Sequence, residues 1–241
     1  MLKEIAAQIA SRGGRSFYVG GFVRDQYLPN KDNTRRDIDV EVFFLGPRDL
    51  REVLSAFGEV KVVGHSYPVF KIKHLPAYDF TLAPAGSYEQ AALRRDFTIN
   101  ALMMDIMTGE LLDPCGGLKD LREGTIRHTQ PLVFQEDPLR VYRAARLAAR
   151  LDFSISPETL MAMRKTDLTC VEPERILREL TKMLLDSNQP STGLRYLEKG
   201  GVIERRHPEL FRLKSCVQSP AHHPEGDVWE HTLLVVDIPK R

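Results

Sequence analysis

The chain has 241 residues, enough for one large domain or for two to three small ones. It is 42% hydrophobic and 28% charged, as in ordinary globular proteins, and its 34 basic and 33 acidic residues nearly cancel. This balance excludes a histone-like protein. It leaves an RNA-handling enzyme open, because a local basic face is sufficient to bind nucleic acid.

Cysteine usage and hydropathy indicate the compartment. Cys115, Cys170 and Cys216 are far apart and have no metal-ligand spacing, so we interpret them as reduced thiols. The N-terminal segment is charged and lacks the apolar core of a signal peptide. No stretch approaches the roughly 18 apolar residues of a membrane helix. We expect a cytoplasmic protein without membrane contact, and no stable protein partner can be inferred.

The predicted elements fall into two parts. In the first part, patterns predict helices and strands together; the helices are at 1–12, 22–28 and 47–58, and the strands at 16–21, 37–45, 60–74 and 77–83. After a junction near 128–134 only helices are predicted, at 136–151, 156–165, 172–186 and 192–201. A last helical segment, 221–237, stops abruptly, as in a piece of a longer protein or a shortened relative. The fold class predicted is α+β, a mixed sheet with flanking helices followed by an all-α segment.

Two acids on a predicted strand give the strongest local signal. Asp37 and Asp39 alternate along the strand, so both carboxylates face one side about 7 Å apart. Such a pair suits hard divalent cations such as Mg²⁺, and Asp79 on a later strand is a third acid for two ions. The alternative is a pair of solvent-facing acids on an edge strand, neutralised by Arg35 and Arg36.

A glycine pair precedes these acids. Gly20 and Gly21 follow a predicted strand, and Arg24 lies one helical turn further on. Paired glycines let backbone N–H groups approach a phosphate, which the arginine can also bind. The segment is neither a dinucleotide-binding fingerprint nor a P-loop, since no Gly-Lys-Ser/Thr follows. The alternative is an ordinary tight turn.

A third cluster spans residues 94–100 (RRDFTIN). Arg95 and Asp96 lie within it, and two arginines beside an acid and an amide suit a triphosphate and ribose hydroxyls. The alternative interpretation is the salt-bridged start of a helix.

A fourth cluster is basic. Arg140, Arg143 and Arg146 recur every third residue and share one broad helical face, and acids and a proline precede them. Such a face is unfavourable unless an anion contacts it. The usual alternative is a solvated face, which Asp137 makes less attractive because Asp137 and Arg140 together offer acceptors and donors to a base edge.

Together these clusters resemble the class II tRNA nucleotidyltransferases, which comprise the bacterial CCA-adding enzymes and the bacterial poly(A) polymerases. The matching segments occur in the family's order and cover most of residues 17–182. They are YVGGFVRDQYL, RDIDVEV, LRRDFTINALMMDI, LLDPCGGLKDL, EDPLRVYRAARLAARLDF and EPERILREL.

The resemblance implies a domain order and a set of roles. It implies a nucleotidyltransferase head at 1–128, a helical neck at 129–205 that selects the nucleotide, and the start of a helical body at 206–241. Asp37 and Asp39 would be metal ligands, with Asp79 as the third catalytic acid. The residues implied to bind the nucleotide are Gly20, Gly21, Arg24, Arg95, Asp96, Asp137, Arg140, Arg143 and Arg146, of which Asp137 and Arg140 would read the base.

The implied reaction is template-independent addition of C, and of A in some members, to the 3′ end of tRNA. The RNA 3′-hydroxyl attacks the α-phosphate of CTP or ATP, two Mg²⁺ ions assist, and pyrophosphate leaves. The rival within the family is a poly(A) polymerase. The rival of another class is a non-catalytic RNA-binding remnant, which would have no use for three converging acids.

Two departures from the family pattern affect the prediction. Members that add all of CCA usually have a long flexible loop after the third acid, whereas here only residues 80–93 precede the RRD segment. This predicts C addition with poor A addition; the alternatives are an enzyme that adds A alone and the poly(A) polymerase. The tail 221–237 resembles the opening of an HD phosphohydrolase domain. Its His222, His223, Asp227 and His231 indicate a metal site, but the required His-Asp pair is absent from these 241 residues, so we expect no phosphohydrolase activity.

Overall fold

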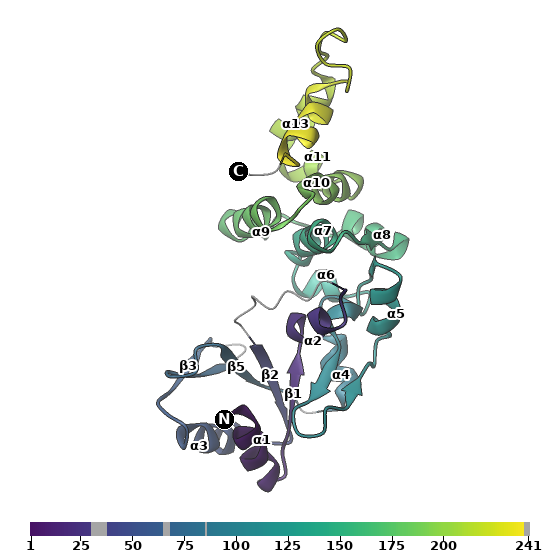
Figure 1. Ribbon diagram of the computed structural model, residues 1–241. Helices are drawn as coiled ribbons and strands as arrows, with labels where there is room; N and C mark the ends of the chain where they lie inside the picture. The colour runs from purple at the N-terminus through teal and green to yellow at the C-terminus, as the bar shows by residue number, and fades with distance from the viewer. Residues whose placement is uncertain (30–37, 65–67, 85, 239–241) are drawn as a thin grey trace. The chain divides into compact units, whose positions relative to one another are not determined.

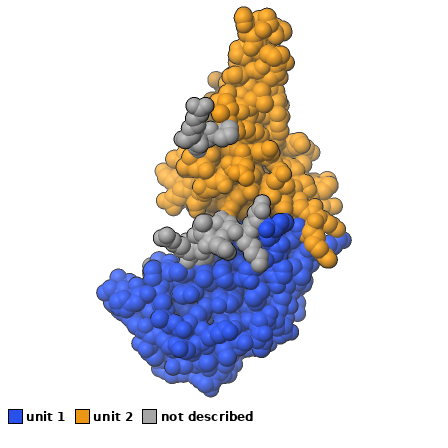
Figure 2. All heavy atoms as spheres, viewed as in Figure 1, with its two compact units in different colours: residues 1–121 blue, residues 122–241 orange. Residues whose placement is uncertain are grey.

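The computed structural model describes residues 1–29, 38–64, 68–84 and 86–238. The chain divides into two compact units, Met1–Leu121 and Arg122–Arg241, which Figure 2 colours separately. No helix among the described residues is long and apolar enough to cross a membrane.

Unit 1 contains a sheet with helices around it (Figure 1). The helices are α1 (Leu2–Ser11), α2 (Gly21–Gln26), α3 (Pro47–Ser55), α4 (Tyr88–Leu93), the 3₁₀ turn η1 (Thr98–Asn100) and α5 (Gly117–Arg122). The strands are β1 (Arg15–Val19), β2 (Ile38–Phe43), β3 (Val60–Val63), β4 (Val69–Ile72), β5 (Tyr78–Leu82), β6 (Met103–Asp105) and β7 (Leu111–Leu112).

The sheet is mixed, as predicted. Its strand order is β3-β4-β5-β2-β1-β6-β7, and β2 and β5 run parallel whereas the other neighbouring pairs are antiparallel. A parallel pair needs a crossover connection, which α3, β3 and β4 supply between β2 and β5. The parallel pair brings residues 40 positions apart into direct register, including Asp39 opposite Asp79.

Strand alternation assigns the two faces of the sheet. Val40 and Val42 point to one face and pack with Phe80 against helices α1 and α3, where Ile5 and Leu50 are fully buried. The alternate residues of β2 and β5 therefore point to the other face.

That second face is only partly covered. A small cluster over its β1 side consists of Phe17, Val19, Phe43 and Met103 with Ala91 of α4. Glu41 of β2 lies opposite Phe17 of this cluster and is buried, whereas Asp39 of the same strand is exposed. Charged groups therefore adjoin the apolar cluster on this face.

Unit 2 is helical apart from one short strand pair (Figure 1). Its helices are α6 (Val133–Glu136), α7 (Arg140–Leu151), α8 (Pro157–Lys165), α9 (Pro173–Asp186), α10 (Pro190–Lys199), α11 (Val202–Arg206), α12 (Pro208–Phe211), η2 (Arg212–Ser215) and α13 (Val228–Val236). Two-residue strands β8 (Thr125–Ile126) and β9 (Ser154–Ile155) pair in parallel. This pair is a small exception to the predicted all-α segment, and it is too short to give a periodic signal.

Helix α7 is central to unit 2 and packs against α9 and α10. Alanines on α7 and a glycine on α10 allow the close approach: a Cβ atom at Gly193 would lie 2.9 Å from the carbonyl oxygen of Ala145 and 2.3 Å from Met183 Sδ. Prolines in the first turns of α8, α9 and α10 suit helix starts, since proline lacks an N–H that would be unsatisfied there. The predicted α+β class is thus confirmed.

Candidate functional site

A row of charged residues crosses three neighbouring strands of unit 1, β2, β5 and β4. Asp39 on β2 lies in register with Asp79 on β5, and Asp79 in turn is opposite Lys71 on β4. The Lys71 ammonium lies 2.6 Å from Asp79 Oδ1 and 2.9 Å from Oδ2, whereas Asp39 is exposed. Asp37 lies outside the described residues. The structure thus brings two of the three predicted acids side by side.

Gly20 and Arg95 adjoin this row. A Cβ atom at Gly20 would lie 3.5 Å from both Asp39 Oδ2 and Arg95 Nη1, so the three residues converge. Gly20 has φ +68°, a conformation that favours glycine, and it is the N-cap of α2, which begins at Gly21. Arg95 Nη2 donates to Glu41 Oε2 at 2.7 Å. The result is an exposed carboxylate beside a guanidinium and a helix N-terminus.

Arg24 has different surroundings from those predicted. It is 1% exposed, and its guanidinium donates to Asp25 Oδ1 at 2.5 and 2.7 Å and to Asn100 Oδ1 at 2.8 Å. Asn100 Nδ2 donates to Asp96 Oδ1 at 2.9 Å, and the backbone N–H of Phe97 donates to the same oxygen. Arg24 and Asp96 therefore belong to a buried network that joins α2 to the turn η1. Their contact with a nucleotide stays a prediction.

The RRD segment does not begin an α-helix. Helix α4 ends at Leu93, and residues 98–100 form a single 3₁₀ turn. A pocket of about 390 Å³ borders the segment. Among the residues that line it are Glu41, Thr81, Pro84, Arg94 and Arg95.

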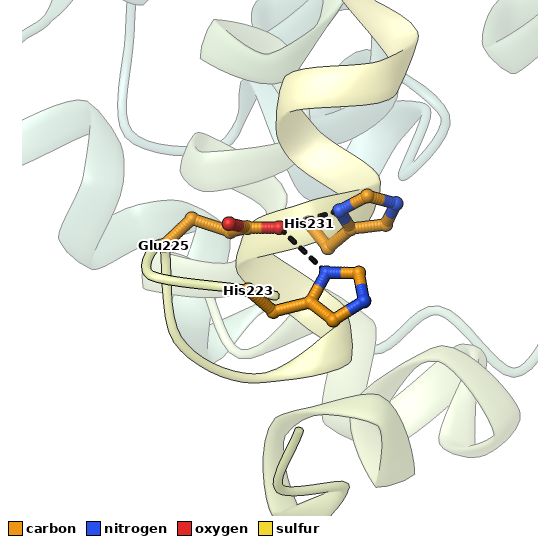
Figure 3. A group of neighbouring side chains, drawn as sticks. All are labelled: His223, Glu225 and His231. Atoms are coloured by element: carbon orange, nitrogen blue, oxygen red, sulfur yellow. Dashed lines mark hydrogen bonds and ion pairs between the residues drawn. The ribbon is translucent and has the colours of Figure 1, made fainter. Parts of the chain in front are cut away.

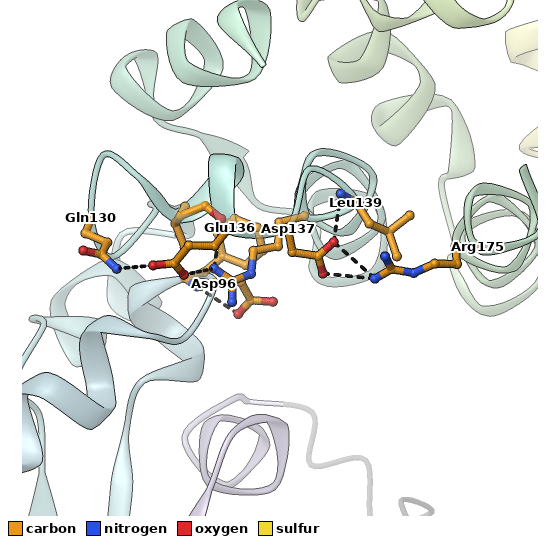
Figure 4. Close-up of polar contacts among 9 residues, drawn as sticks. Asp96, Gln130, Glu136, Asp137, Leu139 and Arg175 are labelled. Carbon is orange, nitrogen blue, oxygen red and sulfur yellow. Dashed lines mark hydrogen bonds and ion pairs between the residues drawn. The ribbon is translucent and has the colours of Figure 1, made fainter. Parts of the chain in front are cut away.

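In unit 2, Asp137 lies between α6 and α7 and binds an arginine of α9. Arg175 Nη2 donates to both carboxylate oxygens, at 3.1 and 3.2 Å, and the N–H of Leu139 donates to Oδ1 at 3.3 Å (Figure 4). Glu136 lies next to it and accepts from Gln130 at 3.2 Å. Asp137 is thus held by one arginine of α9 and by the backbone N–H of Leu139.

The arginines of α7 also contact carboxylates of the protein. Arg140 Nη1 donates to Glu136 Oε2 at 3.1 Å and to the Val133 carbonyl at 2.9 Å. Arg146 Nε donates to Glu179 Oε2 at 2.6 Å, and both side chains are largely buried. Arg143 lies half-buried one turn from each of the other two. Part of the anionic charge that the basic face requires thus comes from α6 and α9.

A cavity in unit 2, of about 700 Å³, is larger than the pocket at Arg95 in unit 1. It is lined mainly by residues between His128 and Cys170, among them Phe134 and Met161, and by none of the predicted site residues. The volume of a cavity alone therefore does not identify the candidate functional site.

Sequence reasoning missed several of the partners. Lys71 had a usable signal, because Phe70 and Ile72 are the inward residues of its strand and the lysine between them must face outward with Asp79. Arg175 and Glu179 had no such sequence signal. Arg175 is 38 residues from its partner Asp137, and Glu179 is 33 residues from its partner Arg146.

The tail differs in one respect from prediction. Of the residues proposed for metal binding, His223 and His231 approach each other, and Glu225 joins them, although the sequence analysis did not single it out. His222 is exposed, and Asp227 is the N-cap of α13, accepting from the Glu230 N–H at 3.0 Å.

Two family models match the chain. The Poly A polymerase head domain matches residues 69–127, and the probable RNA and SrmB-binding site of polymerase A matches residues 152–213.

Curated relatives match most of the chain. A Multifunctional CCA protein of Xylella fastidiosa strain M23 is 38% identical over 249 residues, covering 93% of this chain and 57% of the relative. One of Alkalilimnicola ehrlichii is 36% identical over 244 residues, covering 91% and 56%. The chain thus spans a little over half the length of these relatives.

Solved structures are similar as well. The Thermotoga maritima CCA-adding enzyme complexed with tRNA-CCA superposes with a TM-score of 0.74 and 28% identity, over 92% of this chain and 54% of that one. The Bacillus stearothermophilus CCA-adding enzyme in complex with CTP gives 0.71 and 31%, over 83% and 51%.

Proposed function

We propose that this chain, which belongs to the class II tRNA nucleotidyltransferase family, adds nucleotides to the 3′ end of tRNA without a nucleic-acid template. The single observation that carries the proposal is the pairing of Asp39 with Asp79 on the open face of the sheet, beside Gly20 and Arg95. The similarity to enzymes solved with CTP, ATP and tRNA supports CTP or ATP and tRNA as substrates.

In unit 1 the open face would bind the triphosphate. Gly20 is the N-cap of α2 and Gly21 is its first residue, so their N–H groups belong to the helix N-terminus, and the Arg95 guanidinium supplies positive charge beside Gly20. Asp39, Asp37 and Asp79 are carboxylates, the donors that Mg²⁺ prefers, and the exposure of Asp39 fits such a ligand. Bound Mg²⁺ would supply activation of the RNA 3′-hydroxyl and charge stabilisation of the pyrophosphate that leaves.

Lys71 would act as a positioning residue in this scheme. It neutralises Asp79 and holds the carboxylate in the row with Asp39. Arg24 would position rather than bind: through Asn100 and Asp96 it fixes the turn that follows Arg95. These roles differ from direct contact with the nucleotide, and both rest on the contacts within unit 1.

In unit 2 Asp137 and Arg140 would read the base edge, and Arg143 and Arg146 would support them. Arg175 and Glu136 hold the first two side chains by charged hydrogen bonds, which limits their rotamers. The division of labour is thus a catalytic head at 1–128, a selecting neck at 129–205 and the start of a body at 206–241.

The product we propose is tRNA extended by C, with A added poorly. Strand β5 ends at Leu82 and helix α4 begins at Tyr88, so residues 83–87 connect them. So short a connection gives little slack for a lever that re-aims Asp137 and Arg140 from one base to the next. The relatives that carry the CCA name weigh against the rival, a poly(A) polymerase.

The test uses three tRNAs, ending before CCA, after C and after CC, each with CTP, ATP or both. C addition to the first two with poor A addition to the third is the expected result, and Asp39→Ala protein is the inactive control. Efficient completion to CCA would contradict the C-only product while retaining the enzyme class. Use of ATP alone in long tails would favour the poly(A) polymerase, and absence of any incorporation would contradict the proposal.

A further inference from the structure

Three side chains with metal-binding chemistry meet in the segment between η2 and α13. Val217 bridges to Asp227, and the Val228 N–H donates to the Cys216 carbonyl at 3.1 Å, so residues 217–227 form a closed loop at the start of α13. The loop carries His223 and Glu225, and α13 carries His231 (Figure 3).

The geometry of this cluster is compact. Glu225 Oε1 lies 3.1 Å from His223 Nδ1 and 2.6 Å from His231 Nδ1, and one ligand atom from each residue lies within 4.8 Å of the others. The two imidazole ring centroids are 5.0 Å apart and the rings are nearly perpendicular. The side chains of His223, Glu225 and His231 are 31%, 18% and 40% exposed, respectively, so an ion has access to them from solvent.

These distances are close to those of a bound metal ion. Zn²⁺ binds imidazole nitrogen and carboxylate oxygen at about 2.0–2.2 Å, so neighbouring ligands of a tetrahedral site lie about 3.4 Å apart. The two nitrogen–oxygen distances need small outward shifts, and the loop and side-chain rotamers can supply them. Two imidazoles and one carboxylate favour a transition metal over Mg²⁺ or Ca²⁺, which prefer oxygen ligands.

We propose that His223, Glu225 and His231 form a site for a divalent transition metal such as Zn²⁺, with solvent as the fourth ligand. The site needs no His-Asp pair from elsewhere, and it excludes two residues that the sequence brought forward, His222 and Asp227. It is independent of the nucleotidyltransferase assignment.

The carboxylate is well prepared as a ligand. Its oxygen Oε1 already faces Nδ1 of both His223 and His231, so the three ligand atoms point toward one another. As a carboxylate, Glu225 also offers a negative charge that two neutral imidazoles lack.

A bound ion would tie the loop to a helix that is itself docked. Helix α13 contacts α10 through the Arg195–Glu230 ion pair, at 2.6 and 3.0 Å, and through Asp237, which accepts from Ser191. Trp229 on the same helix is buried and donates to Glu198. Metal binding therefore stabilises the C-terminal part of unit 2, because an ion that binds only the folded state shifts unfolding by mass action.

Cobalt is a suitable probe, since tetrahedral Co²⁺ absorbs visible light whereas Zn²⁺ is silent. The 241-residue protein is stripped with chelator and titrated with Co²⁺, then with Zn²⁺ in competition, and its thermal unfolding is followed with and without metal. The variants are His223→Ala, the near-isosteric Glu225→Gln, and His222→Ala as a matched control one residue away.

Visible absorption that saturates at one Co²⁺ per chain is the expected result. Affinity should fall roughly tenfold or more in His223→Ala and Glu225→Gln and stay unchanged in His222→Ala. Nucleotide incorporation and circular dichroism should be the same in all variants. Equal Co²⁺ affinity in His222→Ala and His223→Ala would overturn the proposal, as would absorption typical of thiolate ligands or the absence of Co²⁺ binding to the unaltered protein.

Discussion

The two units position their predicted functional residues in different ways. In unit 1 Asp39 and Asp79 are neighbours because the backbones of two strands pair in register. In unit 2 Asp137 and Arg146 are positioned by single ion pairs with Arg175 and Glu179 on another helix. Backbone pairing does not depend on the side chains it presents, whereas an ion pair is lost when either partner changes. We therefore expect a substitution at Asp39 to change chemistry alone, and substitutions at Asp137 or Arg146 to couple chemistry with packing.

The sharpest test of this separation is Asp39→Ala. We expect nucleotide incorporation to fall by roughly a hundredfold or more, about 2.7 kcal/mol in the barrier, because a metal ligand is removed. The free energy of unfolding should not fall, since the residue is exposed and its strand pairs through the backbone. Asp37→Ala is expected to behave alike. Single-nucleotide incorporation and urea unfolding measure the two quantities.

The control is Glu59→Ala, an exposed acid of unit 1 that pairs with Lys73 outside the row. It should leave incorporation unchanged. Incorporation by Asp39→Ala near that of the unaltered protein, with Mg²⁺ present, would remove Asp39 from the site.

Packing in unit 2 is probed by Gly193→Ala. The added Cβ would lie 2.9 Å from the backbone oxygen of Ala145, so α10 must move away from α7. We expect a loss of about 1–3 kcal/mol in unfolding free energy, typical of overpacking. The neighbouring substitution Thr192→Ala serves as the control in the same denaturant titration. A Gly193→Ala protein as stable as that control would mean that the α7–α10 contact is looser than its geometry indicates.

Nucleotide choice is probed by Arg140→Ala. A lost contact to a base edge costs roughly 1–3 kcal/mol of discrimination, so relative use of CTP, ATP, UTP and GTP should become more even. The Glu136 carboxylate also loses a partner, so a small loss of stability should accompany the change. Competition assays with the four nucleotides measure the effect, with exposed Arg178→Ala as control. Unchanged preferences would show that the base is read by other residues.

What could be predicted from the sequence also differs between the two units. The sheet residues were predictable because alternation along a strand fixes the face, and Val40 and Val42 mark the inward positions beside Asp39. The helices of unit 2 were predictable from their period and their proline starts. Partners such as Arg175 were not, because helix–helix packing has no signature in one sequence. The burial of Arg24 could not be predicted for a related reason. The adjacent Asp25 neutralises its charge, but its guanidinium also donates to the side-chain oxygen of Asn100, which is 76 residues away in the sequence.

The smallest expected effect is on the pH dependence of the free energy of unfolding, and it arises in unit 2. His207 is half-buried beside Tyr142 of α7, whose hydroxyl lies 3.0 Å from His207 Nε2. Burial lowers the pKa of His207 below its ordinary 6.5, and Arg206 lowers it further whereas Glu209 raises it. The unfolded chain then binds a proton more readily than the folded one. The contribution of His207 to stability is therefore complete above pH 6.5, and it falls as the pH drops from there through the pKa of His207 in the folded protein.

His207→Gln keeps a polar partner for Tyr142 but cannot titrate, so its unfolding free energy should depend less on pH below 6.5 than that of the unaltered protein. The lowered pKa of buried His128 leaves part of the dependence in place. Denaturant titrations across this range, with exposed His222→Gln as the control, measure the slopes. If the unfolding free energy of His207→Gln and of the control changed equally with pH, other groups would account for the loss of stability at low pH.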